Sequence, residues 1–206
     1  DGLLVSSPAN ISYLTESLSR DSYLLVSPKK NIYFTDSRYT EEAKAFLRDE
    51  VMLKECNGFV FKHIAETAIG LVFKRVGFEE RYLPFAEFVK VKEYAAGKFS
   101  LFPTHSIIEN KRQVKDSQEI VKLRKATRIT ALALEHIKQF VFPGVKEIEV
   151  VAEVERFIRY QGARCSAFDI IVASGPNSSQ PHHLSGQRKL KKGESVLIDL
   201  GVDYQG

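Results

Sequence analysis

Residues 167–206 constrain this chain more than any other stretch. Residues 167–174 form an apolar segment that predicts a strand, and a Gly175-Pro176-Asn177 turn and the pair His182-His183 follow it. A basic turn over residues 188–193 then leads to a second apolar strand, residues 196–200, which contains a single carboxylate, Asp199. The sequence therefore predicts two strands that carry few but chemically capable side chains.

Asp199 requires an explanation, because an ionised carboxylate buried among Val, Leu and Ile is costly unless a cation or strong donors compensate it. One interpretation is a metal ligand. The other is that Asp199 ends the strand and caps the turn at Gly201. The strand alone does not decide between them.

Composition excludes several classes of protein. The chain has 206 residues, 44% of them hydrophobic and 27% charged, which allows one large globular domain or two small ones. The net charge of +4 is spread without a basic block, so we expect no nucleic-acid partner. The spacing of Cys56 and Cys165 indicates neither a zinc knuckle nor a disulfide framework, and no window has the roughly 20 apolar residues of a membrane span. We therefore expect a cytoplasmic protein with no membrane partner.

The first half of the chain alternates between strand and helix patterns. Strands are expected at residues 2–6, 22–26, 31–34 and 51–56. A turn at Pro8-Ala9-Asn10 with a short helical piece over residues 11–14 is expected after the first strand, and helices at residues 40–48 and 63–76. This alternation predicts an independent α/β domain over residues 1–110. We expect its phenylalanines to fill the core: Phe59, Phe61, Phe73, Phe78, Phe85 and Phe88.

The second half begins after a stretch with no helical period. Residues 101–116 contain Pro103 and a burst of charge, so the domain boundary is placed there. A helix is then predicted over residues 117–140, with a buried stripe at Ile120, Leu123, Ala126, Thr127, Thr130, Leu134 and Ile137. A second helix follows over residues 147–160. With the two strands, residues 111–206 form a second, incomplete domain.

These motifs together resemble the creatinase, prolidase and aminopeptidase P family of metallopeptidases, whose catalytic domain has the pita-bread fold. The resemblance is carried by the order and spacing of Pro8-Ala9-Asn10-Ile11, Thr35-Asp36-x-Arg38-Tyr39, Lys115-Asp116-x-x-Glu119-Ile120, Pro143-Gly144-x-x-Glu147, residues 167–177, Pro181-His182 and Asp199-x-Gly201. It implies an α/β creatinase-like N-terminal domain followed by the first part of an α+β pita-bread catalytic domain. The spacing is most similar to that of compact prokaryotic Xaa-Pro dipeptidases or aminopeptidases P.

The resemblance implies hydrolysis of peptide bonds to proline in short peptides by a site with two divalent cations (Mn, Co or Zn). Asp199 matches the first metal-binding Asp of the family, and the later Asp, His and Glu ligands would lie past Gly206. Because one carboxylate cannot hold two hard cations, we expect these 206 residues alone to bind no metal pair and to be inactive.

The resemblance also implies roles for other residues. His182 matches the family histidine that lies beside the metals, a catalytic role, whereas by itself it would be a surface-loop histidine. Phe168, Ile171 and His183 are expected to bind substrate, although an apolar strand would also bury Phe168 and Ile171, and adjacent histidines cannot easily both face one site. Asp36 and Arg38 are expected to form a structural salt bridge. In the family the N-terminal module covers the active site and helps to form a homodimer.

Two alternatives remain open. The chain could be part of a metal-free binding or interaction protein that keeps this fold without catalysis, or of a creatinase-type hydrolase that works without metal. The residues that follow Gly206 would distinguish these alternatives from a metallopeptidase.

Overall fold

The computed structural model describes residues 1–16 and 20–206. Its contacts divide the chain into two compact units, Asp1–Val114 and Lys115–Gln205. Each unit has its own hydrophobic cluster.

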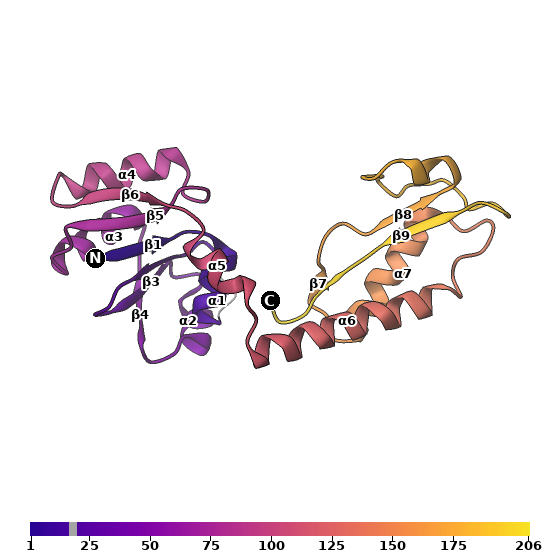
Figure 1. Cartoon of the computed structure of the whole chain (residues 1–206), viewed down its shortest axis with the longest axis horizontal. Coiled ribbons are helices and arrows are strands. Elements are labelled where there is room, and N and C mark those ends of the chain that lie inside the picture. The colour runs from indigo at the N-terminus through magenta and orange to yellow at the C-terminus, as the bar shows by residue number, and fades with distance from the viewer. Residues whose placement is uncertain (17–19) are drawn as a thin grey trace. The chain divides into compact units, whose positions relative to one another are not determined.

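The first unit is built on a mixed sheet with the strand order β4-β3-β2-β1-β5-β6 (Figure 1). The strands are β1 (Gly2–Val5), β2 (Tyr23–Val26), β3 (Asn31–Thr35), β4 (Val51–Glu55), β5 (Arg75–Glu79) and β6 (Ser100–Thr104). β2 pairs antiparallel with β1 and with β3, and the remaining pairs are parallel. The α/β character expected for this half of the chain is confirmed.

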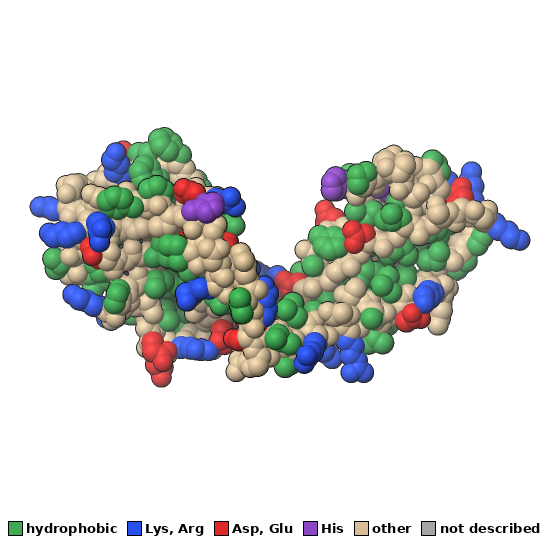
Figure 2. All heavy atoms as spheres, viewed as in Figure 1, with side chains coloured by type: hydrophobic (Ala, Val, Ile, Leu, Met, Phe, Trp, Pro, Cys, Tyr) green, Lys and Arg blue, Asp and Glu red, His purple; other side chains and the backbone are tan. Residues whose placement is uncertain are grey.

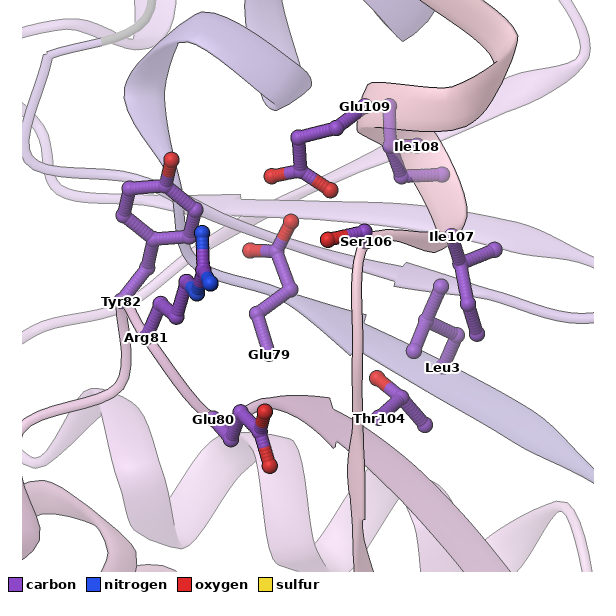
Figure 3. A pocket seen from close by; sticks show the side chains of 10 residues that line it. All are labelled: Leu3, Glu79, Glu80, Arg81, Tyr82, Thr104, Ser106, Ile107, Ile108 and Glu109. Atoms are coloured by element: carbon purple, nitrogen blue, oxygen red, sulfur yellow. The ribbon is translucent and has the colours of Figure 1, made fainter.

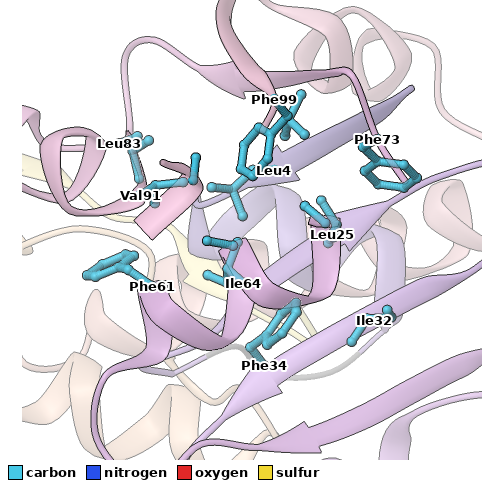
Figure 4. Close-up of a cluster of buried hydrophobic side chains, with 14 of the residues drawn as sticks. Leu4, Leu25, Ile32, Phe34, Phe61, Ile64, Phe73, Leu83, Val91 and Phe99 are labelled. Atoms are coloured by element: carbon cyan, nitrogen blue, oxygen red, sulfur yellow. The ribbon is translucent and has the colours of Figure 1, made fainter. Parts of the chain in front are cut away.

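Helices cover both faces of this sheet. They are α1 (Pro8–Thr15), α2 (Thr40–Phe46), α3 (Val60–Gly70), α4 (Phe85–Ala95) and α5 (Ile107–Gln113). One cluster packs α3 and α4 against the sheet (Figure 4), and a second packs Ile11 of α1 and Ala43 of α2 against Val5, Leu24 and Tyr33 on the other face. The alternation of Leu4 and Val5 between the two clusters is the period of two that a strand imposes.

Four expectations for this unit were wrong. Pro8-Ala9-Asn10 is the first turn of α1, because proline suits the first helical position and the Ser7 hydroxyl accepts a hydrogen bond from the Asn10 amide at 3.4 Å. The helix expected to reach residue 76 ends at Gly70. Residues 101–116, expected to be irregular, include most of strand β6 and the whole of helix α5, and β6 tolerates Pro103 because it is an edge strand. Phe59 and Phe85 are 73% and 79% exposed, whereas Phe61 and Phe73 are buried as predicted.

A buried carboxylate, Glu79, holds the turn between β1 and α1. Glu79 accepts hydrogen bonds from the Ser6 and Ser7 amides at 2.6 and 2.8 Å, and the Asn10 side-chain amide donates to both Glu79 and Glu109. Glu79 and Glu109 also line a small cavity (Figure 3). This cavity measures about 10 Å³, the space of a single water, so this network is structural and leaves no room for a peptide.

The second unit contains two helices, two short two-stranded sheets and a 3-10 turn. The elements are α6 (Ser117–Ile137), α7 (Glu147–Tyr160), β7 (Cys165–Ser166), β8 (Ile171–Ser174), η1 (Gly175–Ser179), β9 (Val196–Asp199) and β10 (Val202–Asp203). β8 pairs antiparallel with β9, and β7 with β10. α6 begins with a capping box in which Asp116 and Glu119 satisfy each other's backbone amides.

The buried face of α6 includes Ile137 of the predicted stripe but differs from it at several other positions. Ile129, Ala133 and Ile137 are the buried residues of α6 and pack against Val150, Val154 and Ile158 of α7. Ile120, Leu123 and Leu134, expected in the stripe, are 37%, 51% and 39% exposed. The prediction failed because apolar residues occur around most of this helix, so periodicity alone did not single out the contacting face.

The surface carries mixed charge. On the face shown in Figure 2, Lys and Arg side chains alternate with Asp and Glu over both units. Among the described residues, no helix combines the length and the apolar character that a bilayer crossing requires.

Candidate active-site residues

Asp199 and Ile171 lie directly opposite each other on neighbouring strands. The register of β8 and β9 pairs Ile171 with Asp199, so both side chains project from the same face of the pair. The Asp199 side chain is exposed, whereas Ile171 is half-buried. The sequence argument that Asp199 is buried among apolar residues is therefore wrong for this chain, and its carboxylate is available to bind a ligand.

Phe168 lies close to the turn that follows Asp199. The Ala167 amide donates to the Gly201 carbonyl at 3.0 Å, and the Phe168 ring would meet a Cβ atom placed on Gly201 at 3.0 Å. The side chain of Phe168 is nonetheless 46% exposed. The structure thus brings Phe168, Ile171 and Asp199 into one small region around β8 and β9.

The two adjacent histidines have different surroundings. Nε2 of His183 lies 2.8 Å from Oε2 of Glu147, and the His183 side chain is only 11% exposed. His182 is exposed. The two histidines follow a turn in which the His183 amide donates to the Gln180 carbonyl at 3.2 Å, and only the His183 side chain faces Glu147.

Glu147, which the sequence motifs contain without a predicted role in the site, organises the loop that carries both histidines. Its fully buried carboxylate accepts hydrogen bonds from the Ser174 amide and hydroxyl, both at 2.8 Å, and from the Asn177 side-chain amide at 3.0 Å. The Gly186 amide donates to it at 3.4 Å. A signal was present in the sequence, since Glu147 belongs to the motif Pro143-Gly144-x-x-Glu147 and continues the helical stripe of Val151, Val154 and Ile158.

The hydrogen bonds decide the ionisation of Glu147. Burial raises the pKa of its carboxyl, but the donors His183, Ser174 and Asn177 outweigh burial and lower the pKa from 4.5 to about 2. Glu147 is consequently an anion at neutral pH, and His183 donates to it from Nε2. The Asn177 side-chain nitrogen lies 3.3 Å from Nε2 of His183. Both nitrogens are donors, and both bond to the Glu147 carboxylate and not to each other.

A second ion pair extends this network. The Ser174 hydroxyl accepts from Nη1 of Arg188 at 2.6 Å, and Nη2 of Arg188 bonds to Oε1 of Glu194 at 2.7 Å. Both side chains of the pair are about a fifth exposed, at 22% and 21%. The loop after β8 is thus held by two carboxylates, one at each end of a chain of polar contacts.

The residues present do not by themselves form a metal site. Within residues 1–16 and 20–206, no three His, Cys, Asp or Glu side chains are grouped so as to hold a metal ion. Asp199 is a suitable ligand for a hard cation, but a single carboxylate does not fit the pair of cations that the resemblance implies.

The predicted salt bridge in the N-terminal unit is present. Arg38 bonds to Asp36 at 2.7 Å and to Asp21 at 3.2 Å on the protein surface. A cavity of about 290 Å³ lies nearby in this unit, lined by Tyr23, Phe59 and Phe61 among others. It contains none of the predicted site residues, all of which belong to the second unit.

Comparison with known proteins identifies the class. The profile of the Creatinase/Prolidase N-terminal domain matches residues 1–114, and that of metallopeptidase family M24 matches residues 121–206. The uncharacterized peptidase YqhT of Bacillus subtilis is 34% identical over 206 residues, which is 100% of this chain and 58% of that protein.

Solved structures agree with this assignment. The Xaa-Pro dipeptidase from Bacillus anthracis superposes with a TM-score of 0.92 at 34% identity, over 100% of this chain and 57% of that one. The X-Pro aminopeptidase from Thermotoga maritima gives a TM-score of 0.89 at 29% identity, over 100% of this chain and 59% of that one. The chain belongs to the creatinase, prolidase and aminopeptidase P family, with a creatinase-type N-terminal domain and the start of a pita-bread M24 domain. It spans less than three fifths of the length of these relatives.

Proposed function

We propose that the full-length protein, meaning a protein of the relatives' length that contains this chain, is an Xaa-Pro metallopeptidase of the dipeptidase or aminopeptidase P type. Its substrates are short peptides with a bond to proline, and it acts as a cytoplasmic homodimer. The similarity of the whole chain to an Xaa-Pro dipeptidase at a TM-score of 0.92 is the observation that carries this proposal.

The roles of individual residues belong to the same proposal. Asp199 supplies one carboxylate ligand to a pair of divalent cations, and His182 contacts the reacting peptide. Phe168 and Ile171 offer apolar surface for the substrate's side chains, which their position beside Asp199 supports. His183 was predicted to bind substrate, but its bond to Glu147 favours a role in holding the loop. The cations supply polarisation of the scissile carbonyl and activation of water.

The test is cleavage of a dipeptide with proline in second position by the purified full-length protein. We expect turnover that depends on added Mn²⁺ and that EDTA abolishes, with the same dipeptide in reversed order as the matched control. No metal-dependent cleavage of either Xaa-Pro dipeptides or tripeptides would refute the proposal and favour the binding-protein alternative. Cleavage that survives complete removal of metal would favour the creatinase-type alternative.

The 206-residue chain gives a second arm of this test. Because it contains one proposed ligand of the metal pair, we expect it to remain inactive with Mn²⁺ or Co²⁺ at concentrations that activate the full-length protein. Metal-dependent turnover by the isolated chain would show that the ligand set is complete within these residues.

A further inference from the structure

The loop between β8 and β9 is held at several points along its first half. Ser174, Asn177, His183 and Gly186 all donate to the Glu147 carboxylate at 3.4 Å or less. The Ser185 hydroxyl adds a further contact, since it accepts from the Val172 amide at 2.7 Å and donates to the Val172 carbonyl at 3.1 Å. His182 lies within this segment and is the exposed member of the histidine pair.

We propose that Glu147 is a positioning residue for His182. The donors converge on one buried carboxylate from both sides of His182, so the carboxylate fixes the path of residues 174–186 and with it the direction of the exposed imidazole. His183 is the link, because its bond to Glu147 orients the backbone adjacent to His182. The effect of Glu147 on catalysis rests on the proposed function, whereas its effect on the path of the loop does not.

The physical reason is the cost of an alternative loop path. Moving the loop would leave buried donors and an ionised carboxylate unsatisfied, which is expensive in a water-excluded site. A catalytic group is effective only when it is held close to its productive geometry, and a misplacement of about 1 Å reduces the rate by about 100-fold. A fixed carboxylate at the base of the loop supplies that rigidity.

The same helix provides a matched control. Glu153 of α7 also bonds to a histidine, His136, at 2.6 Å, and hydrogen bonds from Arg156 and His136 lower its pKa to about 2 as well. The Glu153 side chain is 14% exposed and contacts α6 and its own helix, not the β8–β9 loop. Glu153→Gln therefore removes the same kind of carboxylate–histidine contact without touching the loop.

The structural arm measures amide hydrogen exchange in the 206-residue chain, independently of any activity. In Glu147→Gln we expect exchange across residues 174–186 to accelerate by about tenfold or more, while α6 remains as protected as in the parent. In Glu153→Gln the loop should be unchanged. If Glu147→Gln does not fold, Asn177→Ala, which removes one of the donors to Glu147, provides the same measurement. Unchanged loop exchange in a folded variant would overturn the proposal whatever the enzyme's activity.

The catalytic arm is a double-mutant cycle in the full-length protein. We expect Glu147→Gln to lower kcat/KM for an Xaa-Pro dipeptide by about 10–100-fold, and Glu153→Gln to change it by less than about twofold. Because Glu147 acts through His182, adding Glu147→Gln to His182→Ala should cause little further loss. Losses that multiply in the double variant would show a general structural role and overturn the positioning role. If the parent protein cleaves no Xaa-Pro peptide, the proposed function fails, and the exchange measurement alone decides the role of Glu147.

Discussion

Glu147 and His183 form a buried contact of 2.8 Å between a helix N-terminus and the loop of the proposed active site. The contact joins residues 36 positions apart in sequence and makes the loop dependent on the charge of one carboxylate. This dependence has a measurable consequence for stability at low pH.

Acid should destabilise the second unit through Glu147. The folded-state pKa is depressed from 4.5 to about 2, so the stabilisation is fully present above pH 4.5 and is lost as the pH falls from 4.5 towards 2. The difference of about 2.5 pKa units corresponds to about 3 kcal/mol as an upper estimate. Urea unfolding followed by far-UV circular dichroism suits a chain without tryptophan. Glu147→Gln should be less stable than the parent at pH 7 and lose less stability between pH 4.5 and 2. Parallel pH profiles of parent and variant would contradict the prediction.

A side chain at Gly175 should cost more stability than one at another glycine with positive φ. Its φ is +50°, and a Cβ atom there would lie 2.8 Å from the Glu194 carboxyl carbon and 2.9 Å from Nη2 of Arg188, so Gly175→Ala both strains the backbone and separates that ion pair. We expect a loss of about 2 kcal/mol in the free energy of unfolding. Gly193→Ala is the control, because its φ is +82° but no atom lies within 4 Å of the added carbon, and it should cost about 1 kcal/mol. Equal losses in the two variants would show that the contact with the ion pair contributes nothing.

The two units should separate under limited proteolysis. α5 ends at Gln113 and α6 begins at Ser117. Residues 114–116 therefore form a short linker between two hydrophobic clusters that pack separately. We expect trypsin to cut near Lys115 and to leave a stable N-terminal fragment that ends close to residue 115. Mass spectrometry identifies the cut. Degradation without any stable fragment would argue against an independent N-terminal domain.

Much of the fold was predictable because local patterns and long-range packing agree in most segments. The strands near residues 2–6 and 31–34 and the helix over residues 147–160 have clear periods and clear end signals. Residues 101–116 did not, since β6 is an edge strand whose pairing with β5 comes from the sheet, not from its own sequence. The exposed Phe59 and Phe85 show that composition does not reveal which aromatic residues a small core has room for.

The site was less predictable than the fold. The family resemblance identified His182 and Asp199 as candidates, but the exposure of Asp199 and its pairing with Ile171 depend on strand register. Glu147 was missed because its partners come from four positions distant in sequence, which no local pattern connects. The motif Pro143-Gly144-x-x-Glu147 contains this residue, but the resemblance gave it no role in the site.

The most direct test of the central proposal is the metal content and activity of full-length Asp199→Asn. Asparagine keeps the shape of aspartate but removes the charge that offsets a cation, so we expect bound metal to fall by at least one equivalent and Xaa-Pro cleavage to fall by about 100-fold or more. If Asp199 only caps the turn at Gly201, asparagine can accept the same hydrogen bond, and the change should cost at most about 1 kcal/mol of stability. Full metal occupancy with near-normal turnover in Asp199→Asn would contradict the proposed metal site.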